Sequence, residues 1–175
     1  MKRTLLFMVL MCCATLSYSQ ESTSFFDRLI VDGRLTAFAK QHEMSPLGLQ
    51  IRWGYMVTGR LGAFASLEAI NGFGNSEKGV GTYHASNSLG GGVMYRLVDS
   101  ETGFLPGFRT LDVHASCGTT LGNLAWKYTM YDVGLSIGLK KHNTPTLGLG
   151  YRVMDSRNDH VKSFNGLYVF LGFRL

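Results

Sequence analysis

Apolar and polar residues alternate one by one along most of the chain that follows residue 26. A period of two is typical of β-strands, because successive side chains of a strand point to opposite faces. Turn signals and polar stretches, the longest over residues 71–82, interrupt the alternation. We therefore predict an all-β fold with eight antiparallel strands, at 27–40, 47–57, 60–70, 83–97, 108–121, 125–139, 146–154 and 163–175. Pro46, Pro106 and Pro145 are expected just before strands, where a missing N–H breaks no ladder bond.

The alternation keeps one phase through all eight predicted strands. Odd positions carry aliphatic and aromatic side chains, and none in the middle of a strand is charged. Even positions carry many of the 22 glycines and nearly all the charges within the strands. Because buried charges have to be paired, we expect the even face to form a salt-bridged network if it points inward. Its members are Arg34, Arg52, Glu68, Arg96, Asp112, Asp132, Lys140, Arg152 and Arg174.

Two kinds of closed barrel have alternating strands. A soluble, lipocalin-like barrel turns its charges outward, whereas a membrane barrel turns its apolar residues to lipid. Glycines suit the crowded interior of an eight-stranded barrel better than a water-facing wall, which favours the membrane barrel. After the first 19 residues no run of 18 apolar residues occurs, and a closed barrel is then the structure that can span a bilayer. A soluble periplasmic barrel that carries a small apolar ligand remains the alternative.

The first residues have the layout of a secretory signal peptide. A basic start at Lys2 and Arg3 precedes an apolar stretch over 4–16, and small residues stand at Ser17 and Ser19 before Gln20. We expect residues 1–19 to be removed and residues 20–175 to form one outer-membrane domain. Removal lowers the formal charge from +5 to +3, which is too little to indicate a nucleic-acid partner.

Few residues suggest chemistry. The five histidines are scattered without metal-ligand spacing, and no cofactor or metal is expected. The segment His-Ala-Ser occurs twice, at 84–86 and 114–116. If the turn after the fifth strand centres near residue 123, His114 lies opposite Asp132; if the preceding turn centres near 102, Ser116 lies opposite Ser88. That register gathers His114, Ser116, Asp132 and Ser88 as either a Ser-His-Asp site or a hydrogen-bond network within the barrel.

The last residues, Tyr168-Val-Phe-Leu-Gly-Phe-Arg-Leu175, form an alternating strand that ends on an apolar residue. This segment resembles the C-terminal β-signal of outer-membrane barrels, and the chain from residue 20 resembles the small eight-stranded barrels of the OmpX and OmpA transmembrane-domain type. The resemblance implies outer-membrane lipid around the barrel, insertion by the barrel-assembly machinery and both termini in the periplasm. Since the interior of such a barrel has room only for side chains, we expect a role in envelope structure or surface interaction rather than transport.

The segment from His84 to Asn87 also resembles the His-x-Ser segment of the outer-membrane lipid A deacylases. That resemblance implies a lipid-modifying enzyme as a further alternative. The active site of those enzymes faces lipid, whereas strand parity turns His84 and Ser86 inward, and no glutamate follows at the matching spacing.

Overall fold

The computed structural model describes residues 25–40, 44–75, 81–100, 107–122, 127–139, 143–157 and 163–175. The predicted signal peptide, Lys140 and Pro106 lie outside these residues. A short 3-10 helix, η1 (Phe25–Arg28), precedes eight strands. The strands are β1 (Leu29–Phe38), β2 (Met44–Met56), β3 (Leu61–Asn75), β4 (Gly81–Asp99), β5 (Thr110–Thr120), β6 (Tyr128–Gly138), β7 (Thr144–Ser156) and β8 (Phe164–Arg174).

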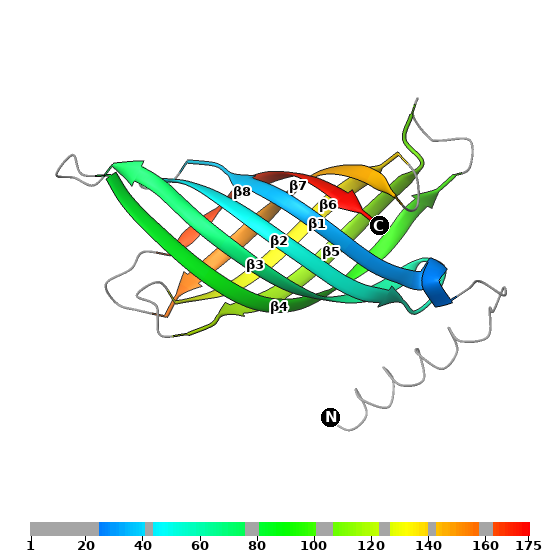
Figure 1. Ribbon diagram of the computed structural model, residues 1–175, viewed down its shortest axis with the longest axis horizontal. Helices are drawn as coiled ribbons and strands as arrows, with labels where there is room; N and C mark the ends of the chain where they lie inside the picture. Colours follow the sequence, from blue (N-terminus) through cyan, green and yellow to red (C-terminus); the bar gives the residue numbers. More distant parts are fainter. Residues whose placement is uncertain are drawn as a thin grey trace, which may run out of the picture.

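Each strand pairs antiparallel with its neighbours in the sequence, and β1 pairs with β8. The sheet is therefore a closed up-and-down barrel whose strands run obliquely round a single interior (Figure 1). The prediction of eight antiparallel strands in one barrel is confirmed. Closure leaves the paired part of the barrel without a free sheet edge. Among the described residues no helix is long and apolar enough to cross a membrane.

The two faces of the strands differ as the parity predicted. Odd positions such as Leu49, Val133 and Leu167 are 60%, 56% and 61% exposed on the outer wall. Even positions are turned inward, and the burial pattern of β8 alternates without a break through its first eight residues. One irregularity occurs where β4 pairs with β5, as a bulge between Arg96 and Val98. Odd residues thus face outward and even residues inward through the strands, and the register shift between β4 and β5 lies at this bulge.

Several predicted boundaries were wrong. The segment 71–82, expected as a polar loop, belongs largely to the β3–β4 hairpin, which pairs as far as Asn75 with Gly81. Pro46 lies inside β2 and Pro145 inside β7, each one residue past the last pair that its strand makes on one side, Ala37–Leu47 and Gly138–Thr146. A proline is tolerated there because the neighbouring strand on that side no longer pairs, so no ladder hydrogen bond needs its missing N–H.

Bulky apolar side chains also point inward, which the sequence reasoning missed. One cluster, near the end of the barrel where β8 begins, holds Phe38, Ile70, Tyr128, Met130, Met154, Phe164, Tyr168 and Phe170. A second, near η1, holds Ile30, Met56, Phe64 and Met94. All stand at even positions, so the parity already marked them. The interior thus has an apolar cluster towards each end and charged side chains between them.

Candidate functional site

The centre of the barrel interior is a bridge of two carboxylates and one guanidinium. Arg152 on β7 donates from Nη1 to Glu68 Oε2 on β3 and from Nη2 to Asp132 Oδ2 on β6, each over 2.8 Å. Its Nε also donates to Asp132 Oδ2, over 3.3 Å. All three side chains are almost fully buried. Buried charges are stable only when paired and hydrogen-bonded in this way.

Asp132 also interacts with side chains from two further strands, β5 and β8. Ser116 on β5 donates to its Oδ1 over 2.9 Å, and the hydroxyl of Tyr168 on β8 donates to its Oδ2 over 3.0 Å. The His114 ring nitrogen Nε2 lies 3.2 Å from the Tyr168 hydroxyl and 3.6 Å from Asp132 Oδ1. Asp132 is thus a hub that joins β5, β6, β7 and β8 through side chains as well as through the ladder.

Arg52 lies beside this hub without a close carboxylate of its own. Its Nη2 is 4.0 Å from Asp132 Oδ1, its Nε donates to Gln50 Oε1 over 2.7 Å, and its guanidinium stacks over the Phe64 ring at 4.6 Å. Gln50 in turn donates to Glu68 over 3.2 Å. A hydrogen bond to a neutral amide and a cation–π contact therefore supply much of what holds this cation.

A second set of ion pairs lies nearer η1. Asp112 on β5 accepts from Arg96 Nε over 3.0 Å and from Arg174 Nη1 over 2.7 Å. Arg34 donates through Nε and Nη2 to Asp32 Oδ2, over 2.7 and 2.6 Å, and stacks over the Phe170 ring at 4.1 Å. These pairs, the central bridge and Arg52 beside it include every residue of the predicted charge network except Lys140, which lies outside the described residues.

The register expected for the His-Ala-Ser segment was wrong. Ser116 pairs with Asp132, and His114 pairs with Gly134. On the other side Ser116 pairs with Gly92, four residues beyond Ser88. A turn centre that is misplaced by one residue displaces the pairing by two, since each strand contributes one residue to the shift.

Three of the four candidate residues nevertheless meet, because side chains reach across neighbouring pairs. Ser116 donates its proton to Asp132, however, and among the described residues no hydrogen bond joins Ser116 to His114. Ser88 donates to the backbone oxygen of Glu68 over 3.4 Å. A nucleophilic serine needs its base within hydrogen-bond reach, and the arrangement here instead satisfies a buried carboxylate.

A small cavity lies between the central bridge and the strands β3 to β5. It has a volume of about 10 Å³, and Ser66, Ser88, Ser116 and Gly90 are among the residues that line it. Such a volume has room for about one water molecule. This cavity beside Ser116 and Asp132 is too small for a substrate. Among the described residues no group of three His, Cys, Asp or Glu side chains could hold a metal ion.

The His-Ala-Ser segment at 84–86 gives less evidence of a catalytic site. Ser86 is buried, in keeping with its even position, and the side chain of His84 lies outside the described part of the chain. The chain matches neither a family model nor a curated protein.

Proposed function

We propose that the chain is an outer-membrane β-barrel with its apolar outer wall in lipid, and that it serves envelope structure or surface interaction rather than transport. The observation that carries the proposal is the polarity of the barrel, which is the reverse of a soluble one. Charged side chains such as Asp32 and Arg152 are 1% and 2% exposed, whereas Leu149 and Leu167 are 55% and 61% exposed. Soluble monomers rarely expose large continuous apolar surfaces.

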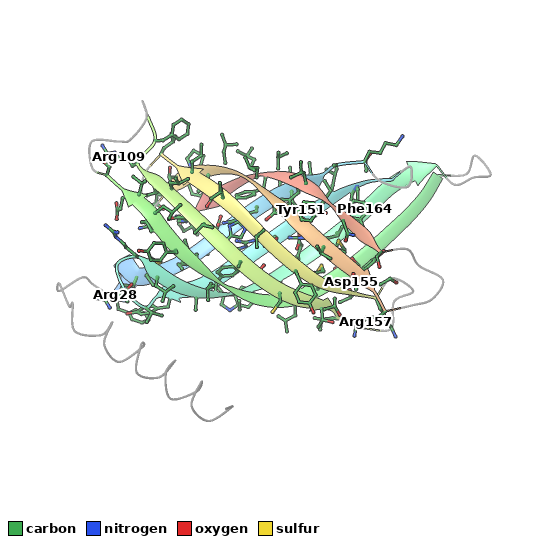
Figure 2. The ribbon with its side chains drawn as sticks, turned by 180° about the vertical axis from the view of Figure 1, so that it is seen from behind. Arg28, Arg109, Tyr151, Asp155, Arg157 and Phe164 are labelled. Atoms are coloured by element: carbon green, nitrogen blue, oxygen red, sulfur yellow. The ribbon has the colours of Figure 1, made fainter. Side chains whose placement is uncertain are left out.

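The dimensions of the wall support the same proposal. Its strands have 10 to 19 residues, and about 9–11 residues of a tilted strand cross a bilayer. Charged side chains gather at the two ends, with Arg28 and Arg109 at one and Asp155 and Arg157 at the other (Figure 2). The outward aromatic residues Tyr95 and Phe173 stand near the end marked by Arg28. An apolar band between polar and aromatic margins suits the two interfaces of a bilayer.

Near the other end of the barrel, described aromatic residues lie on both faces of the strands. Tyr128 is 2% exposed because it stands at an even position, and it packs inside the barrel. Tyr131 and Tyr151, at odd positions, are 52% and 45% exposed on the wall.

A closed interior argues against transport. The central bridge and the two apolar clusters fill the barrel between its ends, and the cavity beside the bridge has about 10 Å³. Opening a path for solutes would require buried ion pairs to separate without replacement partners, which is expensive. A barrel with a closed interior acts through its outer wall, through its two ends, or through what these surfaces contact.

Cell fractionation tests the proposal. The full chain, produced in a Gram-negative host, is expected in the outer-membrane fraction after an alkaline wash, and to migrate differently on a gel before and after boiling. A chain that starts at Gln20 serves as the control, because it lacks the segment proposed as the signal peptide and should stay in the cytoplasm. Recovery of the full chain from the soluble periplasm, with one migration position boiled or unboiled, would overturn the proposal.

A further inference from the structure

The buried charges that the structure describes do not cancel. Among the described residues five arginines and four carboxylates are buried inside it. Asp99 lies at the end of β4, where a quarter of its side chain is exposed, and its carboxylate is 3.8 Å from Arg96. It therefore compensates the charge of Arg96 only in part. A buried charge without compensation is costly, so the excess positive charge calls for a counter-ion.

Polar atoms without a hydrogen-bond partner gather in the half of the interior near η1. They include two guanidinium nitrogens, Arg34 Nη1 and Arg174 Nε, and the hydroxyls of Thr110, Ser136 and Thr146. Around Glu68, Asp132 and Arg152 the carboxylate and guanidinium groups are engaged, and of the described polar atoms there His114 Nδ1 alone lacks a partner. Buried polar groups almost always have a partner, so such a concentration indicates a bound water or ion.

The ladder aligns three of these residues in one row of paired positions. Thr110, Gly138, Thr146, Gly172 and Arg34 are successive partners in one row across β5, β6, β7, β8 and β1. The two glycines of the row carry no side chain. Thr146 Oγ1 and Arg34 Cγ lean over Gly172, at 2.7 and 3.1 Å from the position that its Cβ would occupy.

Arg174 completes the group from the side. It stands on β8 two residues after Gly172, and its Nη1 reaches Asp112 on β5. Its side chain therefore spans from β8 to β5, past β7 and β6. Asp112 pairs with Ser136 and lies two residues after Thr110 on the same strand face. The path of this side chain from β8 to Asp112 crosses the strands that carry Thr146, Ser136 and Thr110.

We infer that this part of the interior binds one small monovalent anion of chloride size, between Thr146 and the guanidinium of Arg34, with the Arg174 Nε and the Thr110 and Ser136 hydroxyls around it. Every one of these groups can donate a hydrogen bond, and two of them carry positive charge. The buried atoms are sealed from solvent, which favours a halide over a larger oxyanion. The side chains of Thr146 and Arg34 separate over Gly172 to admit the ion.

One unpartnered atom near the proposed site is an acceptor. Asp32 Oδ1 also lacks a partner, while Oδ2 of the same carboxylate accepts from Arg34 Nε and Nη2. That carboxylate repels an anion on its own side of the guanidinium. Arg34 Nη1 is the nitrogen left free of Asp32, so the anion binds Arg34 through this nitrogen, away from the carboxylate. The inference concerns the interior alone and holds whether the outer wall faces lipid or water.

Unfolding in matched salts tests the site. The chain from Gln20, refolded in detergent micelles, is unfolded by heat in sodium chloride and in sodium gluconate of equal ionic strength. Ligands that bind the folded state raise its stability, so we expect a higher, saturable midpoint in chloride. Thr146→Val removes the hydroxyl with little change of shape and should abolish the difference. Thr36→Val is the control, because Thr36 is an inward threonine that donates to Glu68, outside the proposed site, and the difference should persist.

Bromide gives a second, independent reading. Crystals of the unaltered chain grown in bromide should show anomalous scattering between Thr146 and Arg34, and this decides the matter if Thr146→Val does not fold. Equal midpoints in the two salts together with no bromide at this position would overturn the inference and assign the unpartnered atoms to water. A chloride effect that survives Thr146→Val, with bromide found elsewhere, would overturn it as well.

Discussion

Arg152 and Asp132 are direct partners across the β6–β7 ladder, and two hydrogen bonds, Nη2–Oδ2 at 2.8 Å and Nε–Oδ2 at 3.3 Å, join their side chains. The third guanidinium nitrogen, Nη1, donates to Glu68 on β3, a strand that is far from β7 in the barrel. A single arginine therefore ties the wall at β6 and β7 to the wall at β3. Because the pair is buried, its loss should affect stability far more than the loss of a surface pair.

Asp132→Asn should destabilise the barrel by about 3–5 kcal/mol, because it leaves Arg152 and Arg52 buried with less compensation. The amide keeps the shape of the side chain, so the change isolates the charge. Urea titration of the refolded barrel in micelles measures the effect. Asp155→Asn, at an exposed position near the end of β7, is the control and should change the free energy of unfolding by less than about 0.5 kcal/mol. Equal effects of the two substitutions would contradict the assignment of Asp132 as a hub.

Arg152→Met combined with Asp132→Asn should be less damaging than the two single changes added together. Each single change leaves a buried charge unpaired, whereas the double change removes both members of the pair. We expect a coupling free energy of about 0.5–3 kcal/mol between the two positions, measured by the same urea titrations in a double-mutant cycle. The pair Arg152→Met and Asp155→Asn should be additive, since these side chains lie on opposite faces of β7. Additivity at Asp132 would mean that its bond to Arg152 contributes little.

Much of the fold could be predicted because one rule applies to every strand. The odd and even faces of β7, for instance, follow from Leu147, Leu149 and Tyr151 on one side and Arg152 on the other. Closure then decides that one face is inside. The same rule predicts that Phe38 and Tyr168 point inward. They were missed because the prediction for the even face considered only charged residues and glycines.

The pairing between strands could not be predicted in the same way. The pairing depends on the lengths of the loops and on the bulge between Arg96 and Val98. Neither can be inferred from the alternation of apolar and polar residues. The contact between Ser116 and Asp132 therefore required the three-dimensional structure. Ion pairs such as Arg174 with Asp112 are harder still, because a long side chain reaches past two intervening strands.

Glycines at inward positions should differ sharply from glycines on the wall. A Cβ at Gly148 would clash with the Phe170 ring and with the backbone oxygen of Leu135, whereas one at Gly33 meets nothing within 4 Å. We expect Gly148→Ala to cost about 1–3 kcal/mol of stability through overpacking. Gly33→Ala should be neutral or stabilise by about 0.4–1 kcal/mol, because alanine restricts the unfolded chain. Both follow from thermal or urea unfolding, and a larger loss at Gly33 would mean that the wall is not where the structure places it.

An arginine in the middle of the outer wall should separate a lipid-facing barrel from a soluble one. Leu149 stands near the centre of β7 between Leu135 and Val169, and 55% of it is exposed. If this wall faces lipid, Leu149→Arg should cost about 2–4 kcal/mol, and Val57→Arg, one residue after the end of β2, about 0–1 kcal/mol. Urea titration of both variants in phospholipid vesicles gives the two free energies, and the unboiled gel band gives the folded fraction. In a soluble barrel both positions face water, and both substitutions should stay within about 0.5 kcal/mol. Equal, small effects at the two positions would therefore exclude the membrane assignment, while a loss that is several-fold larger at Leu149 supports it.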